Sequence, residues 1–207
     1  MHIRHACRPR PAAIGAVLAL ALFRPPAAGA QPPSAAAQAP VVRDARGRVT
    51  VRAVRVDTPP RIDGVLDEPI YASVTPISGF IQQDPDEGQP ATEATRVWIS
   101  FDARAIYIAA RCEDSQPERI VANDMRRDGR NITQGDNFSV VLDTFHDRRN
   151  AYEFLTNAIG GMFDTQITDE RDVNRDWNTT WVERSRRDPG GWTVEMAIPF
   201  RSLRYRG

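Results

Sequence analysis

The sequence predicts an all-β fold, an antiparallel β-sandwich of the two-sheet jelly-roll or immunoglobulin-like kind. Apolar and polar residues alternate over residues 93–101, 105–112 and 192–200, the period-2 pattern of half-buried strands. Turn sequences separate the apolar segments at short intervals, as in sandwiches. Only residues 68–73 and 117–123 resemble helices, and both are too short to form a helical layer.

The composition suits one globular domain and excludes a class of partners. The chain has 207 residues, 41% of them hydrophobic, which is enough for a packed core. Its 27 basic residues are all arginine and balance 27 acidic residues. Residues 1–30 hold four arginines and no acid, so the remainder carries a net charge of −4. We therefore predict no nucleic-acid binding, because neutralising phosphates requires a basic surface.

The first 48 residues are predicted to lie outside the folded domain. Residues 1–30 resemble a secretory signal peptide, with basic residues before an apolar run at 12–23 and small residues before Gln31. An uncleaved N-terminal anchor is the alternative, although the run is shorter than the about 20 residues that span a bilayer. Residues 31–48, rich in Pro and Ala, are expected to be a disordered spacer. We expect an exported protein, periplasmic or associated with the outer membrane of a Gram-negative bacterium.

The domain is predicted to span residues 49–207, and its first half contains one clear hairpin. Residues 49–57 alternate with a shift of parity, which indicates a bulge or the end of a strand. Residues 62–68 read as a turn with apolar anchors, in which Gly64 permits a positive φ. Residues 93–101 and 105–112 then form the hairpin.

The second half is predicted to add a hairpin and three more strands. The hairpin joins residues 137–145 to 151–157, and the strands cover 162–168, 177–185 and 192–200. The last strand places Trp192 on the same face as its aliphatic residues, which predicts that this tryptophan is buried. Its opposite face carries Thr193, Glu195 and Ala197, so we expect the strand to belong to an outer layer of the sandwich.

Four segments in this order resemble the family 9 carbohydrate-binding modules and their bacterial relatives. They are Ile62-Asp63-Gly64-x-Leu66-Asp67-Glu68, the hairpin Val97–Ala109, Gly135-Asp136-Asn137-Phe138-Ser139-Val140-Val141-Leu142-Asp143, and Gly191-Trp192-Thr193-Val194-Glu195-Met196-Ala197-Ile198-Pro199-Phe200. The resemblance runs from about residue 52 to the C-terminus. It implies a non-catalytic module that binds a polysaccharide or oligosaccharide.

The segment 198–205 resembles a subgroup in which such a module precedes a domain similar to an outer-membrane barrel. That resemblance implies a barrel as partner or as a missing C-terminal domain. In the family, further strands follow this segment, so the sandwich is expected to lack its last strands. The alternative function is a structural or docking domain of an outer-membrane protein, with no sugar ligand.

The resemblance also implies positions for a sugar site. Sugar-binding relatives hold the terminal unit between two tryptophans, with a glutamate, an arginine and asparagines. One tryptophan position would lie beyond Gly207, and the other matching positions are near Thr133 and at Ser139, Leu155 and Asn157. Only Asn157 retains the residue type of the family.

The residues themselves suggest a second candidate for sugar binding. If residues 177–185 form a strand, Trp177, Trp181 and Glu183 point the same way. An aromatic pair beside a carboxylate suits stacking on a sugar ring, whereas the alternative places both tryptophans in the core under a long loop. Trp98 faces either a binding groove or a covering loop.

Oxygen-bearing side chains near the hairpin 137–157 are candidates for a calcium site. Calcium takes six to eight oxygen ligands, and the donors available here are Asp136, Asp143, Asp147 and Asn150. The alternative is that Asp147 and Asn150 form the turn while Asp143 pairs with a neighbouring arginine. Outside residues 1–30 the chain has one Cys and one His, which excludes an intrachain disulfide and a His-rich zinc site. No catalytic constellation is evident, so we predict that the chain is not an enzyme.

Overall fold

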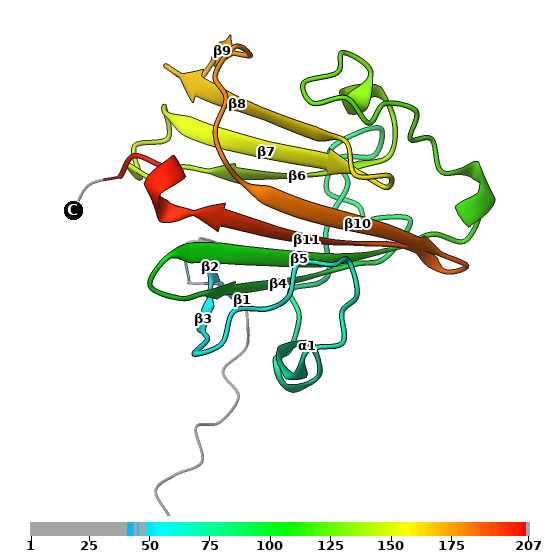
Figure 1. Ribbon diagram of the computed structural model, residues 1–207. Coiled ribbons are helices and arrows are strands. Elements are labelled where there is room, and N and C mark those ends of the chain that lie inside the picture. The colour runs from blue at the N-terminus through cyan, green and yellow to red at the C-terminus, as the bar shows by residue number, and fades with distance from the viewer. Residues whose placement is uncertain (1–40, 44, 46–48, 206–207) are drawn as a thin grey trace, which may run out of the picture. The chain divides into compact units, whose positions relative to one another are not determined.

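The computed structural model describes residues 41–43, 45 and 49–205 and consists mainly of strands (Figure 1). The expected signal peptide and most of the expected spacer lie outside the described residues. A five-stranded sheet has the order β10-β11-β5-β4-β3, and a four-stranded sheet has the order β6-β7-β8-β9. β1 and β2 form a separate pair. The predicted β-sandwich is confirmed.

The five-stranded sheet is built around the first predicted hairpin. Its strands are β3 (Val54–Arg55), β4 (Thr95–Phe101), β5 (Ala105–Glu113), β10 (Val182–Asp188) and β11 (Gly191–Pro199). All its pairings are antiparallel except the two-residue pairing of β3 with β4. The alternating pattern of residues 93–112 therefore identified the centre of this sheet, and only the short parallel pairing differs from the prediction.

The four-stranded sheet contains the second predicted hairpin. Its strands are β6 (Asn137–Leu142), β7 (Ala151–Asn157), β8 (Met162–Thr168) and β9 (Asp172–Asn174). The short elements are β1 (Val41–Arg43), β2 (Val49–Val51), α1 (Pro69–Ser73), and the 3₁₀ turns η1 (Pro117–Arg119), η2 (Ile132–Gln134) and η3 (Phe200–Ser202). The parity shift in residues 49–57 marks a strand end, because β2 stops at Val51. No helix of the described residues has the length and apolar character needed to cross a membrane.

The core lies between the two sheets and contains the alternating residues of the predicted strands. Phe154 of β7 faces the five-stranded sheet, where Ile108, Val194, Met196 and Ile198 are at most 1% exposed. Trp192 is 4% exposed and belongs to this cluster, as predicted. Burying a side chain of this size contributes about 1.5–3 kcal/mol, so these strands hold the two layers together.

The second face of β11 is also buried, which corrects the expectation of an outer layer open to solvent. Glu195 is 1% exposed, and Thr193 is 8% exposed. The segment before β4 covers this face, where Gly64 accepts a hydrogen bond from the Thr193 hydroxyl at 2.6 Å. Gly64 has the predicted positive φ, at 80°, and a Cβ there would lie 3.3 Å from the Cβ of Arg186. Period-2 alternation cannot show such a cover, since it comes from a distant segment without strand periodicity.

Candidate functional site

A polar cavity of about 300 Å³ lies between the β5–β6 connection and the end of β7. Figure 1 shows this connection, in bright green, near the arrowhead of β7. Four amide side chains line the cavity, and the other lining residues are small or aliphatic. The amides belong to Asn123, Asn131, Gln134 and Asn157. No titratable side chain is among these lining residues.

Asn157 forms the floor of the cavity and holds its shape. Its side chain is 1% exposed, and Nδ2 donates to the Asp124 carbonyl at 2.7 Å. Its Oδ1 accepts from the backbone N–H of Gly161 at 2.9 Å and of Ile159 at 3.2 Å. These bonds tie the β5–β6 connection to the β7–β8 turn. A Cβ at Gly161 would lie 2.4 Å from the Asp124 carbonyl oxygen, so the close approach requires glycine at this position.

Further contacts fix the connection against the four-stranded sheet. Ile132, 1% exposed, packs with Leu155 of β7 and Phe163 of β8 in a small apolar cluster. At the other end, Val121 donates its N–H to the Asp136 carboxylate at 2.7 Å, and its carbonyl accepts the Asp136 N–H at 2.8 Å. The cavity walls are thus held in place without a ligand, which reduces the ordering cost of binding.

An ion pair between a partly exposed arginine and a buried carboxylate anchors the same connection from its middle. Arg127 donates to the carboxylate of Asp164, which is fully buried in β8. Asp164 also accepts from the Thr179 N–H at 2.8 Å and from the Trp181 indole N–H at 3.2 Å. Burial raises the pKa of Asp164, while these donors act in the opposite direction. The carboxylate is fully engaged, which identifies it as a structural group and not as a free acid or base.

The resemblance implies positions for the residues that contact sugar in the family. These positions lie around the β5–β6 connection but do not form one open surface. Ser139 is exposed on β6, opposite Leu155 in the strand register. Leu155 is 5% exposed because Ile132 covers it. Thr133 lies in η2, beside Ile132. Of the matching positions, Asn157 alone lines the cavity.

The predicted tryptophan pair is separated by the structure. β10 begins at Val182, so neither tryptophan lies in the expected strand. Trp181 is 4% exposed and packs edge-on against Phe154, with ring centroids 5.3 Å apart. Trp177 is half-buried against Tyr152, at 4.8 Å between centroids. The prediction of a paired platform is therefore corrected, because Trp181 is a core residue and cannot offer a ring face to solvent.

Two other candidates for sugar contact are also buried. Glu183 is 3% exposed, and its carboxylate accepts from the hydroxyls of Thr156 and Ser185, both at 3.0 Å. Burial raises its pKa. Trp98 is 7% exposed, and its indole N–H donates to the Val74 carbonyl at 3.0 Å, which confirms the covering-loop alternative. Neither side chain is available to a ligand in this structure.

The four candidate calcium ligands do not form one site: Asp143, Asp147 and Asn150 lie in one turn, whereas Asp136 lies apart from them. Asp136 precedes β6 and Asp143 follows it, so the length of the strand separates them. Asp143 accepts the N–H groups of Asp147 at 3.2 Å and Arg148 at 2.8 Å. Asp147 accepts the N–H of Asn150 at 2.9 Å and its amide at 2.7 Å. Hydrogen bonding lowers the pKa of both aspartates. Within the described residues, no group of three or more Asp, Glu, His or Cys side chains is arranged to hold a metal ion.

Chelation distinguishes a calcium site from the turn-forming alternative. Because both carboxylates already cap the turn, we expect the same melting temperature with and without a chelator. A reversible drop would contradict this expectation. One site at about 100 times its dissociation constant would add about 2.7 kcal/mol to the unfolding free energy.

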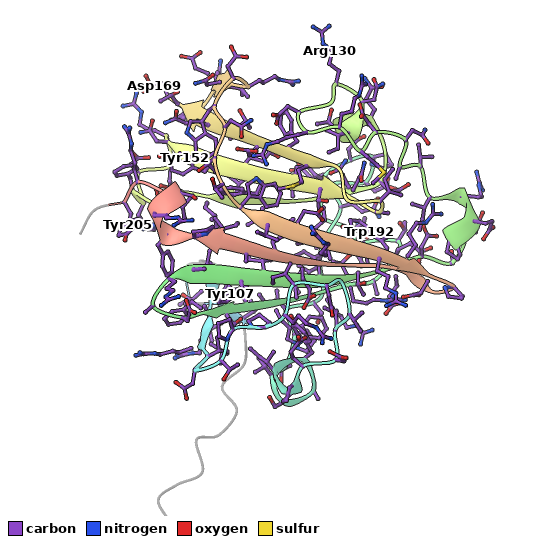
Figure 2. The ribbon with its side chains drawn as sticks, in the orientation of Figure 1. Tyr107, Arg130, Tyr152, Asp169, Trp192 and Tyr205 are labelled. Atoms are coloured by element: carbon purple, nitrogen blue, oxygen red, sulfur yellow. The ribbon has the colours of Figure 1, made fainter. Side chains whose placement is uncertain are left out.

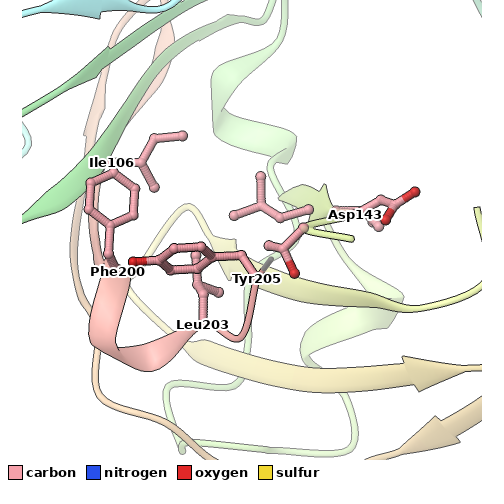
Figure 3. A pocket seen from close by; sticks show the side chains of 8 residues that line it. Ile106, Asp143, Phe200, Leu203 and Tyr205 are labelled. Atoms are coloured by element: carbon pink, nitrogen blue, oxygen red, sulfur yellow. The ribbon is translucent and has the colours of Figure 1, made fainter. Parts of the chain in front are cut away.

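A second hollow, of about 490 Å³, differs from the first in chemistry (Figure 3). Its walls are mainly apolar and aromatic, and they come from the end of β6, the start of β5 and the segment after β11. Phe200 and Tyr205 form an edge-to-face pair with centroids 6.4 Å apart, and Tyr205 is 55% exposed. Its side chains with hydrogen-bonding groups are Asp143, Thr144 and Tyr205, so its lining has fewer such groups than the four amides of the other cavity.

Of the four amides, only Asn157 was predicted from the sequence. Asn123, Asn131 and Gln134 lie in a connection with no alternating pattern, and single polar residues in a loop carry no signal of a shared cavity. The resemblance identified Asn157, and the structure adds the three residues that face it. From the sequence alone, the length and polarity of this connection were the only features that could have pointed to a site here.

Comparisons with known proteins agree with this architecture. Residues 62–206 match the family described as carbohydrate family 9 binding domain-like. The structure described as a putative carbohydrate-binding protein from Bacteroides uniformis has a TM-score of 0.51 and 13% identity, covering 75% of each chain. This likeness concerns the fold. A family 9 carbohydrate-binding module from Caldicellulosiruptor kristjanssonii, in complex with cellotriose, has a TM-score of 0.49 and 20% identity, covering 72% of this chain and 67% of that one. A family 9 module from the same organism, in complex with glucose, has a TM-score of 0.47 and 19% identity, covering 75% of this chain and 73% of that one. No curated protein matches the sequence significantly.

Proposed function

The chain belongs to the carbohydrate family 9 binding domain-like family, and we propose that it is a non-catalytic module that binds an oligosaccharide or polysaccharide in the amide-lined cavity. The observation that carries this proposal is the convergence of four amide side chains on one pre-formed hollow. Each amide presents a carbonyl acceptor and two N–H donors. Sugar hydroxyls both donate and accept, so this lining complements them.

The exposed amides are the ones that would contact the sugar. Asn123, Asn131 and Gln134 are exposed, whereas Asn157 already uses its oxygen and one N–H in the fold. We therefore assign recognition to the first three and support of the cavity to Asn157. A cavity without a carboxylate or histidine in its lining offers no acid or base for glycosidic cleavage, which supports binding without catalysis.

The same proposal includes an exported context. Residues 1–30 contain a basic zone, an apolar zone and a small-residue zone in the order of a secretory signal. Such a leader would deliver the module to the periplasm or the cell envelope, where polysaccharides are encountered. N-terminal sequencing of the protein recovered from that compartment should begin near Gln31, and an intact Met1 on a cytoplasmic product would refute export.

Loss of one cavity amide is expected to weaken sugar binding without unfolding the protein. A glycan array first selects a ligand, with cellotriose and glucose included, and calorimetry then compares variants. A neutral hydrogen bond contributes about 0.5–1.5 kcal/mol, so Gln134→Ala should raise the dissociation constant about two- to tenfold. The melting temperature should stay unchanged, because Gln134 is exposed.

Gln83→Ala is the matched control, since Gln83 is also an exposed glutamine but lies outside the cavity. It should bind as tightly as the unmodified protein. Equal affinities for both variants would show that the sugar binds elsewhere. Absence of binding to every glycan would favour the docking alternative.

A further inference from the structure

The amide-lined cavity also has an apolar wall, which sugar hydroxyls do not match. Val121 lines the cavity and is 49% exposed, and the next residue in the lining is the small Ala122. A hydroxyl placed against a methyl group gives up its hydrogen bond to water and gains none in return, which costs free energy. A ligand that complements this wall therefore presents apolar carbon to Val121.

The backbone holds the Val121 side chain in this wall. Val121 donates its N–H to the Asp136 carboxylate at 2.7 Å, and its carbonyl accepts the Asp136 N–H at 2.8 Å. Gly135 packs directly against it, since a Cβ on Gly135 would lie 2.1 Å from the Val121 carbonyl oxygen and 3.5 Å from its Cγ1. A valine side chain has few rotamers, so the methyl surface is in place before a ligand binds.

Amide side chains border the apolar wall on both of the segments that form it. Asn123 lies two residues after Val121. Gln134 directly precedes Gly135, which packs on the same valine. All of these residues line the cavity. An amide offers N–H donors and a carbonyl acceptor, so it can pair reciprocally with a second amide. The wall thus combines amide and methyl groups, and the sugar substituent with the same combination is an acetamido group.

The charges around the cavity also favour an uncharged substituent. Arg130 belongs to the same connection, but it projects away from the sheets (Figure 2) and is not among the lining residues. Asp136 lies next to the lining, and its carboxylate accepts the Val121 N–H. An acetamido group is neutral, whereas a sugar carboxylate is ionised at neutral pH and would find no cation in this lining.

Given the proposed sugar binding in this cavity, we propose that the site prefers neutral sugars with an acetamido group, such as N-acetylglucosamine, to the corresponding plain sugars. The acetyl methyl packs against Val121, and the acetamido N–H and carbonyl pair with Asn123 or Gln134. The other exposed amides bind ring hydroxyls. Val121 is then a specificity-determining residue, because it contacts the group by which the two kinds of sugar differ.

Two trisaccharides with the same linkage between rings test this preference. Tri-N-acetylchitotriose differs from cellotriose by an acetamido group in place of one hydroxyl on each ring. Burial of one methyl group should make the acetylated sugar bind at least about fourfold more tightly, which calorimetry measures. Deacetylated chitotriose should lack this gain.

The outcomes separate this preference from sugar binding itself. Equal affinities for cellotriose and tri-N-acetylchitotriose would overturn the preference and leave the sugar site standing. The same holds for equal affinities of the acetylated and deacetylated sugars, since the nitrogen and not the acetyl group would then be recognised. Binding of no glycan at all would overturn both the preference and the proposed function.

Replacement of Val121 tests where the acetyl group lies. Val121→Thr exchanges one methyl group for a hydroxyl of similar size and should bring the ratio of the two affinities close to one. Val173→Thr is the matched control, since Val173 is 50% exposed on β9 and is not among the lining residues. It should keep the ratio of the unmodified protein. Equal ratios for the two variants would overturn the assignment to Val121. Circular dichroism confirms folding, and Val121→Ala serves if the threonine variant does not fold.

Discussion

Replacing Glu195 by Ala is expected to lower the unfolding free energy by about 3–5 kcal/mol. The carboxylate is buried on the covered face of β11, where it accepts the N–H groups of Asp63 at 2.9 Å and Gly64 at 2.8 Å. It also accepts the Tyr71 hydroxyl at 2.6 Å. The substitution leaves three donors without an acceptor, and each unsatisfied buried group costs about 1–3 kcal/mol. Urea unfolding at neutral pH measures the loss.

Glu153→Ala provides the matched control. Glu153 also lies in the middle of a strand, but it is half-exposed and has no side-chain hydrogen bond within the described part of the chain. Its replacement should change the unfolding free energy by less than about 1 kcal/mol. Equal losses for the two variants would show that the Glu195 network does not hold the covering segment on β11.

The pH dependence of the unfolding free energy, compared between the unmodified protein and Glu195→Ala, provides a second readout. Burial raises the pKa of Glu195 above its usual 4.5, although its hydrogen bonds act in the opposite direction. The folded state then binds a proton more readily than the unfolded state. The stability contributed by this group is complete below pH 4.5 and decreases as the pH rises through the folded-state pKa. The Glu195→Ala variant should lack this decrease, so its difference from the unmodified protein should narrow with rising pH.

Trp181→Ala is expected to cost about 3–5 kcal/mol, the loss typical of a large aromatic residue removed from a core. The change removes the edge-to-face contact with Phe154 and the hydrogen bond to Asp164. Trp177→Ala should cost less, because Trp177 is half-buried. Thermal and urea unfolding measure both variants, and sugar affinity is compared at a temperature where each is folded. If Trp181→Ala kept its stability and lost sugar binding, the result would support Trp177 and Trp181 as the sugar-binding site.

The fold was largely predictable because the two central hairpins have a period-2 pattern and short turns. Residues 105–112 and 151–157 were assigned to strands from their side chains alone, and both strands are present. The pattern failed at Trp177 and Trp181, where spacing of four suggested one face of a strand. The chain there crosses from β9 to β10 and packs both rings beside Phe154. Spacing cannot distinguish a strand from a crossing segment whose side chains close a core.

The candidate site was less predictable than the fold. Asn157 came from the resemblance, but its three companions lie 23 to 34 positions earlier in the sequence and converge only through tertiary contacts. The buried role of Glu195 was also missed, since alternation placed it on the solvent side of a strand. Its cover is a segment without periodicity, more than 120 residues away in sequence.

Side-chain amide signals in nitrogen-15 NMR report directly on sugar binding in the amide-lined cavity. The protein is titrated with cellotriose and with the best ligand from the glycan array. Since the lining supplies four amide groups, the side-chain signals of Asn123, Asn131 and Gln134 should shift in a saturable way, with Gln83 as the unshifted reference. Shifts confined to residues around Phe200 and Tyr205, or no shifts with any glycan, would contradict sugar binding in the amide-lined cavity.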